Sequence, residues 1–307
     1  MKKFIGKRLI LAIITMWVII TVTFIMMHAV PGDPFSKEGR MPAAVYDSLN
    51  KRYGLDQPLS TQYSIYLKNV VHGDLGDSMY SSAENVNQMI KRGAPVSARL
   101  GLQAFIIAMI LGPLFGSIAA LYQNKAPDYI MMIIALIGIS VPSFILATIF
   151  IKFIAQESEI FPIGGWGSFR HTILPSLALS FMPMASSARL MRSSMLEVLG
   201  QDYVKTAKSK GLSKIRVIMN HAVRNAILPI VSTMGTTLAG LITGSFVIEK
   251  IFGIPGLGAF FVTSIGNRDY TLIMGTTIFY SFILIILLLI VDILYGIIDP
   301  RIDIARN

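Results

Sequence analysis

The chain has few residues whose types and spacing could do chemistry. It contains no cysteine, which excludes disulfides, thiolate metal sites and cysteine nucleophiles together. Neither the His-Glu-x-x-His spacing of a helical zinc site nor the Gly-x-Ser-x-Gly elbow of serine hydrolases occurs. The histidines are scattered over different segments, at His28, His72, His171 and His221. We therefore predict no catalytic residue, no metal site and no cofactor site on this chain.

A glycine-rich segment has the composition of a phosphate cradle. Its residues are Gly253, Pro255, Gly256 and Gly258. An ATP-binding loop carries Gly-Lys-Ser/Thr between a strand and a helix, and that tripeptide occurs nowhere in the sequence. We interpret the segment as an outer loop that dips toward the membrane and lines a cavity, where irregular backbone is tolerated. A plain structural turn is the alternative.

Asp292 is the clearest ionisable residue inside an apolar run. Such a group costs about 2.5 to 3.5 kcal/mol at the centre of a membrane span, so it is a functional suspect by default. Asp299 and Arg301 follow about two helical turns later, which puts the edge of the membrane within reach. We favour a structural anchor with water or a basic partner over a substrate or proton site.

Pro142 interrupts another apolar run. Ser140 and Ser143 flank it, and their hydroxyls can bond the carbonyls that a proline frees. A kink at this position is a candidate moving part of a transport path, with ordinary packing as the equal alternative. Elsewhere, the small-xxx-small pairs Gly112 with Gly116 and Gly240 with Gly244 predict close helix approach.

The elements that position these residues are membrane helices. The chain is 53% hydrophobic and 14% charged, whereas a soluble domain has about 25% charged residues. Crossing a bilayer takes roughly 20 apolar residues as a helix and about half as many as a barrel strand. Six runs have helical length, over residues 9–30, 100–122, 129–154, 173–190, 227–248 and 271–298. The predicted fold class is an all-α membrane protein with six transmembrane helices.

Lysine and arginine orient this predicted bundle. The predicted cytoplasmic segments hold fifteen of these residues and the short outer loops hold four, and basic loops stay cytoplasmic. The net charge of +10 is therefore explained without nucleic acid. The predicted parts are a cytoplasmic N-terminus (1–8), a first span (9–30), an extracytoplasmic segment (31–99), a core of five spans (100–298) that includes a cytoplasmic loop (191–226), and a cytoplasmic tail (299–307).

The cytoplasmic loop is the most informative segment. Asp202 can begin a short helix in which Tyr203, Val204 and Ala207 share one face, and Gly211 can end it. A helix with an apolar face and a basic face, held between two spans, is suited to binding a cytoplasmic partner. A solvated basic loop near anionic lipid is the alternative.

This loop also resembles a known motif. Residues 205–211 (KTAKSKG), followed by Leu228 and Pro229, are similar to the cytoplasmic EAA loop of ABC importer permeases. Lys205 and Thr206 depart from the general pattern, and the gap before Leu228 is longer, but both departures resemble the version found in peptide and nickel permeases. Further matches lie at residues 31–34, 53–59, 73–78, 140–144 and 299–301. Together they resemble the oligopeptide and dipeptide permease branch, in its B-type subunit with the long first outer loop.

The resemblance implies a type I ABC importer permease bundle in the plasma membrane of a prokaryote, with several spans and both termini in the cytoplasm. The implied coupling residues are Asp202, Tyr203, Val204, Thr206, Ala207, Lys210, Gly211 and Leu212. The implied gate or pathway residues are Ser140, Pro142, Ser143, Gly253, Pro255, Gly256 and Gly258.

The resemblance also implies a set of partners. They are a second homologous permease, two cytoplasmic ATPase subunits that carry ATP and magnesium, an extracytoplasmic peptide-binding protein, membrane lipid and a peptide substrate. An importer for nickel or another small solute is the alternative, followed by an ion-coupled secondary transporter. The latter usually needs carboxylates near the bilayer midplane, for which Asp292 is poorly placed.

Overall fold

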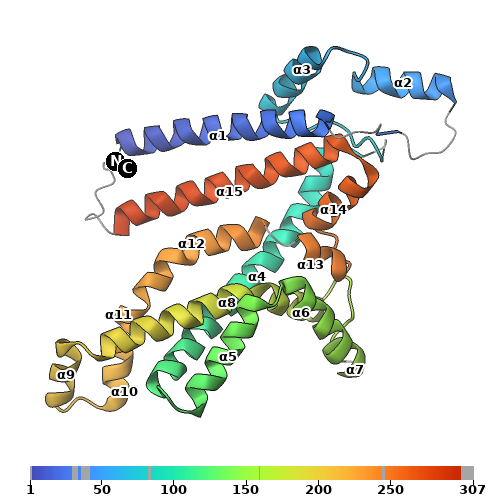
Figure 1. Ribbon diagram of the computed structural model, residues 1–307. Helices are drawn as coiled ribbons and strands as arrows, with labels where there is room; N and C mark the ends of the chain where they lie inside the picture. Colours follow the sequence, from blue (N-terminus) through green and yellow to red (C-terminus); the bar gives the residue numbers. More distant parts are fainter. Residues whose placement is uncertain are drawn as a thin grey trace. The chain divides into compact units, whose positions relative to one another are not determined.

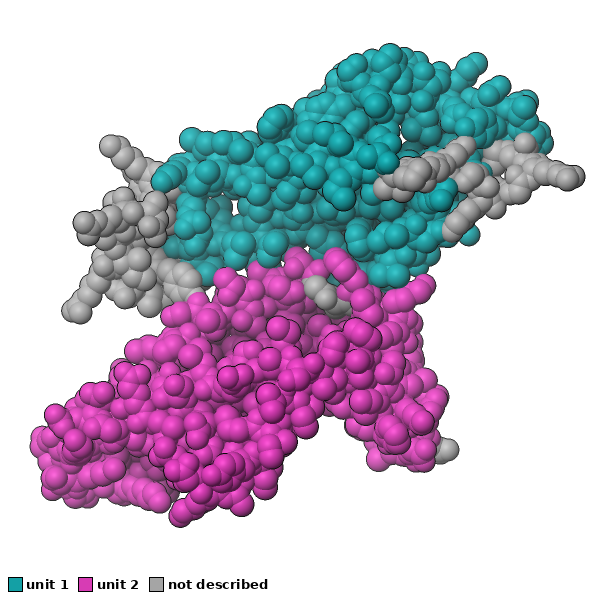
Figure 2. Space-filling model, in the orientation of Figure 1, with its two compact units in different colours: residues 1–97, 255–307 teal, residues 98–254 magenta. Residues whose placement is uncertain are grey.

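The computed structural model describes residues 2–29, 34–35, 42–81, 84–158, 160–243 and 246–298. This part of the chain is helical and has no strand, only an isolated bridge between Asp77 and Asn85. The chain divides into two compact units (Figure 2). Unit 1 comprises Met1–Ser97 with Pro255–Asn307, and unit 2 comprises Ala98–Ile254.

In unit 1, the first and last helices pack side by side (Figure 1). These are α1 (Lys2–Ala29) and α15 (Tyr270–Ile298). Near one end of the pair, Arg8 Nη1 lies 2.9 Å from Asp292 Oδ2. At the other end, the rings of His28 and Tyr270 are 6.4 Å apart, so the two helices are antiparallel. Of the two partners expected for Asp292, water or a basic residue, the structure thus shows the basic residue.

Short helices follow α1 in unit 1. They are α2 (Ala43–Tyr53) and α3 (Leu59–Val71), and both lie within the segment 31–99 that the sequence separates from the apolar runs. The next helix, α4 (Val86–Leu121), contains the expected second span but begins well before residue 100. Its first turns carry Lys91 and Arg92, which lie outside the apolar run but are still part of the helix. A further helix, α14 (Leu257–Asn267), precedes α15, where the sequence led us to expect an outer loop.

Unit 2 is built around α8 (Arg170–Leu199). The helices α5 (Ala126–Ser140), α6 (Ser143–Phe150) and α12 (Leu228–Thr243) pack against it. Gly138 of α5 faces the Phe181 carbonyl and Ala185 of α8, with no room for a side chain. On α4, Gly112 and Gly116 face the α8 backbone in the same way, which confirms the close approach predicted for that pair. Gly240 has no neighbour within 4 Å of an added Cβ, and Gly244 lies outside the described residues.

The expected third span, 129–154, is not one continuous helix. The axes of α5 and α6 meet at 110°, and the turn is made by Val141 and Pro142. A residue that precedes proline is forced toward extended backbone, and Val141 has φ −93° and ψ 121°. After α6 the chain continues through a π-helical turn, η1 (Ile151–Ala155), into α7 (Gln156–Ser158). The predicted kink is therefore a full break in the span.

Among the described residues, four helices are long and apolar enough to cross a membrane, or five when the bent pair counts as one span. The expected fourth span, 173–190, lies inside α8, which is more polar than these helices. Its buried polar side chains include Ser176, Ser180 and Ser187. A helix surrounded by others need not match the polarity of lipid, so α8 fits as the sixth long helix of the bundle.

Candidate functional site

The predicted coupling segment is a chain of short helices at the end of α8 (Figure 1). It consists of α9 (Asp202–Ser209), α10 (Lys214–Val217), the π-helical turn η2 (Ile218–Val223) and α11 (Arg224–Ala226). A cluster of buried side chains, Val204, Ala207 and Val217, holds α9 against α10. Val198 and Leu199 at the end of α8 pack on the same cluster. The apolar face of α9 is therefore occupied by its own chain.

The predicted coupling residues thus fall into two groups. Val204 and Ala207 are buried, and Leu212 packs against them. Asp202, Tyr203, Thr206, Lys210 and Gly211 are exposed. Tyr203 is 44% exposed and is the large apolar side chain that α9 presents outward. The first group fixes the helix on α8, and the second is the surface that a partner could contact.

The rest of the segment is anchored in the same way. Ala222, Ala226 and Ile230 form a second buried cluster with Met191 and Met195 of α8. Because both clusters include side chains from the last turns of α8, the whole segment between α8 and α12 is fixed to that end of α8. A force on α9 would consequently act on α8.

Gly211 ends α9 in a left-handed conformation, with φ +76°. Its N–H donates to the Lys208 carbonyl at 3.0 Å. An added Cβ would meet nothing within 4 Å, so only the backbone angle requires glycine here.

Gly211→Ala should loosen α9 without a steric clash. An alanine costs about 1 kcal/mol in the left-handed region, so amide exchange in α9 should be faster by roughly fivefold. Hydrogen exchange followed by mass spectrometry of the peptide that covers α9 measures this. Gly200→Ala is the matched control, because Gly200 has φ −81° and its added Cβ would lie 3.5 Å from the nearest atom. Equal acceleration by both variants would contradict the conformational explanation.

The predicted gate residues are divided between the two units. Ser140 and Pro142 are exposed at the bend of unit 2, and Ser143 is half-buried. Gly253 is exposed in unit 2, after α13 (Phe246–Ile251), which packs on α6. Of the remaining three, which belong to unit 1, Pro255 is exposed while Gly256 and Gly258 are buried.

The glycine-rich segment is shorter than the irregular loop that we expected. Helix α13 ends at Ile251 and α14 starts at Leu257, so only residues 252–256 are non-helical. Gly165, from the loop before α8, donates its N–H to the Phe252 carbonyl at 2.7 Å. An added Cβ on Gly164 would lie 2.6 Å from that same oxygen. The loop before α8 and the segment after α13 therefore pack tightly against each other, at the end of unit 2 opposite α9.

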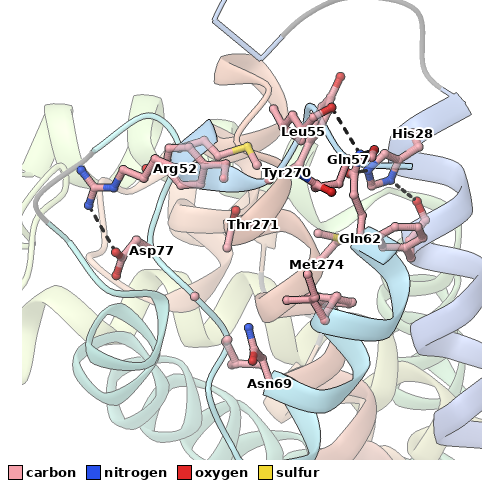
Figure 3. Close-up of a pocket in the computed structure, with 18 of the residues that line it drawn as sticks. His28, Arg52, Leu55, Gln57, Gln62, Asn69, Asp77, Tyr270, Thr271 and Met274 are labelled. Atoms are coloured by element: carbon pink, nitrogen blue, oxygen red, sulfur yellow. Dashed lines mark hydrogen bonds and ion pairs between the residues drawn. The ribbon is translucent and has the colours of Figure 1, made fainter. Parts of the chain in front are cut away.

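Sequence reasoning missed a pocket of about 680 Å³ in unit 1 (Figure 3). Phe24, Tyr66 and Met274 contribute apolar surface to it, and its polar lining residues include His28, Arg52 and Asp77. Several of the polar groups already pair with one another: Arg52 Nη2 lies 3.4 Å from Asp77 Oδ2, and His28 Nε2 lies 3.0 Å from Gln62 Oε1. The pocket could not be read from the sequence, because its residues come from segments far apart in the chain.

Tyr66 differs from the other polar residues of the pocket. Its hydroxyl is buried and has no hydrogen-bond partner among the described residues. Burial raises the pKa of this hydroxyl above its usual range, so the group stays neutral.

A buried carboxylate, Asp269, was also missed. Its oxygens accept hydrogen bonds from the Ser78 hydroxyl, from Met79 N at 3.0 Å and from Leu272 N at 3.1 Å. Leu272 is the third residue of α15, so Asp269 caps that helix and holds the segment before α4 at the same time. An aspartate directly before a long apolar run is a helix-start signal that was available in the sequence.

Comparison with known proteins extends these observations over the whole chain. Residues 112–304 match the family model described as binding-protein-dependent transport system inner membrane component, and residues 1–100 match the model of its N-terminal region. The dipeptide transport system permease protein DppB of Bacillus subtilis is 50% identical over 307 residues, which is 100% of both chains. The oligopeptide transport system permease protein OppB of Escherichia coli K12 is 44% identical over 304 residues, 98% of this chain and 99% of that protein.

Solved structures show a similar fold. The methionine ABC transporter MetNI in an inward-facing conformation matches with a TM-score of 0.52 and 16% identity, covering 69% of this chain and 94% of that chain. An amino acid ABC transporter crystallised with histidines matches with a TM-score of 0.52 and 14% identity, covering 68% and 93%. At these identities the likeness concerns the fold.

Proposed function

Since this chain belongs to the family of binding-protein-dependent transport system inner membrane components, in its oligopeptide and dipeptide permease branch, we propose that it forms half of the translocation path of an ATP-driven importer. The chain is a peptide-transport permease with several membrane helices and is a membrane channel component rather than an enzyme. The peptide would pass between this chain and a second, homologous permease.

The partners follow from this role. Two cytoplasmic ATPase subunits would hold ATP and magnesium, and an extracytoplasmic binding protein would deliver the peptide. No cofactor is needed on this chain itself. Both termini and α9 would lie on the cytoplasmic side of a prokaryotic plasma membrane. The excess of lysine and arginine in these segments over the short loops on the other side supports this orientation.

The observation that carries the mechanism is the anchoring of α9. Its apolar face is packed on the end of α8, and Tyr203, Thr206 and Lys210 remain exposed. A helix held this firmly can transmit the closure of an ATPase pair to the membrane helices, whereas a solvated loop would absorb it. We infer that α9 is the coupling helix, and that Tyr203 and Thr206 contact the ATPase subunit.

Tyr203→Ala should weaken the attachment of the ATPase subunits. An exposed aromatic anchor at the centre of an interface is worth about 2 kcal/mol, or roughly thirtyfold in affinity. The measurement is retention of ATPase subunits on the purified permease pair, together with ATP-dependent peptide uptake in proteoliposomes. Tyr80→Ala is the control for retention, because Tyr80 is also exposed but lies in the extracytoplasmic segment. Native retention and native uptake by the Tyr203 variant would remove α9 from the ATPase interface.

The same vesicles discriminate between substrates and energy sources. Peptide import by this mechanism requires ATP and is competed by unlabelled dipeptides. Uptake that is driven by an ion gradient without ATP, or that is competed by nickel and not by peptides, would contradict the proposed function.

A further inference from the structure

A buried ion pair joins α8 to the first turn of α5. Arg192 donates from Nε to Asp128 Oδ1 at 2.6 Å and from Nη2 to Asp128 Oδ2 at 2.8 Å. The backbone N–H of Asn124 donates to the same Oδ2 at 3.0 Å. The Asp128 side chain is 3% exposed and that of Arg192 is 27% exposed. Two parallel hydrogen bonds from a planar guanidinium fix the orientation as well as the distance of the carboxylate, so the contact is rigid.

On one side, this ion pair is connected to the coupling segment. Arg192 precedes Leu199 by two helical turns, about 10 Å along α8. Leu199 packs on the buried cluster of α9. Met191, beside Arg192, belongs to the cluster that holds Ala222. A displacement of α9 therefore moves the part of α8 that carries Arg192.

On the other side, the ion pair is connected to the broken span. Asp128 lies in the first turn of α5, and α5 runs along α8 to the 110° break at Pro142. The remaining contacts between these two helices include Gly138 against Ala185, a small and apolar contact that permits sliding. A bidentate ion pair does not slide, because both bonds break together.

We propose that Asp128 and Arg192 are positioning residues that make the α5–α6 bend follow the movement of α9. The inference rests on the proposed role of α9 as the coupling helix. In this arrangement, closure of the ATPase pair pulls α9, α8 follows through its apolar clusters, and the ion pair carries the start of α5 with it. The bend at Pro142 then reorients as part of the same movement.

Two substitutions weaken the ion pair in different ways. Asp128→Asn removes the negative charge, and Arg192→Lys keeps the positive charge but replaces the planar fork by a point contact. The matched control is Asp292→Asn, which breaks an ion pair between helix ends in unit 1, with Arg8 at 2.9 Å. All three are compared in the full complex with its ATPase subunits and binding protein, in proteoliposomes.

The readout is peptide taken up per ATP hydrolysed, which loss of protein alone does not change. Both unit 2 variants should lower this ratio by about tenfold, and Asp292→Asn should change it by less than about twofold. The exchange Asp128→Arg with Arg192→Asp should recover part of the ratio. A native ratio in both unit 2 variants, or an equal fall in the control, would overturn the proposal. Should the native complex fail to import peptide, the proposed function itself would fail, which is a distinguishable result.

A distance measurement tests the same idea in any variant that folds. The chain has no cysteine, so spin labels can be placed on single introduced cysteines at Ile133 of α5 and Ile215 of α10, both exposed. In the native background their separation should be the same with and without ATP, because the ion pair makes the two helices move together. In Asp128→Asn a second separation should appear with ATP. An ATP-dependent separation in the native background, or none in the variant, would contradict the proposal.

Discussion

Replacing Gly116 by valine should strongly destabilise the packing of unit 2. An added Cβ would lie 2.6 Å from Met191 Cβ and 3.0 Å from Arg192 N, and closer still to the Ala188 carbonyl oxygen. These are mainly backbone atoms of α8, which cannot rotate away as a flexible side chain would. Overpacking of this kind costs about 3 kcal/mol. Unfolding titrated with SDS in mixed micelles should show that loss, with a matching fall in the amount of folded protein in the membrane.

Gly240→Val is the matched control for this prediction. Gly240 belongs to the other glycine pair of the sequence, but an added Cβ there meets nothing within 4 Å. Both substitutions place the same β-branched residue in a long helix, so the intrinsic cost of valine is shared. We expect the Gly240 variant to unfold within about 0.5 kcal/mol of the native chain. Similar losses in both variants would mean that helix propensity, rather than contact with α8, decides the outcome.

The contrast between these glycines shows how far a sequence pattern reaches. Gly112 with Gly116 and Gly240 with Gly244 have the same spacing, and the spacing correctly predicts close approach for the first pair. It carries no information on what lies opposite, because that depends on which face of the helix another element covers. Apolar runs likewise predicted the membrane helices but not their neighbours, because a helix buried in lipid and a helix buried in protein are both apolar.

The proposed coupling helix, α9, illustrates the complementary limit. Its position, its approximate ends and the glycine that ends it were all predicted from residues 202–211. What its apolar face packs against was not predicted, because an amphipathic helix shows the same sequence pattern whether it binds a partner or its own chain. Val204 and Ala207 turn inward and Tyr203 outward, so the residues predicted to couple divide into anchors and a contact surface. Asp128 and Arg192, whose partnership spans distant segments, gave no local signal.

Asp269→Ala is the other substitution for which we expect a large effect, since one carboxylate organises two elements of unit 1. Its removal leaves the Ser78 hydroxyl, the Met79 N–H and the Leu272 N–H without their acceptor in a buried site. Buried donors that lose a charged acceptor cost about 3 kcal/mol in total, and the start of α15 loses its cap. The free energy of unfolding should fall by that amount.

Limited proteolysis from the side that we propose to be extracytoplasmic separates this prediction from general destabilisation. Cleavage around Ser78 and Met79 should accelerate in Asp269→Ala under conditions in which α8 stays intact, because the anchor of that segment is local. Asp74→Ala is the matched control: Asp74 Oδ1 accepts one hydrogen bond, from Gly76 N at 2.9 Å, at an exposed position. An exposed hydrogen bond of this kind contributes about 1 kcal/mol or less. Equal cleavage rates in the two variants would show that the segment before α4 is held by its apolar contacts, with Asp269 serving only as the cap of α15.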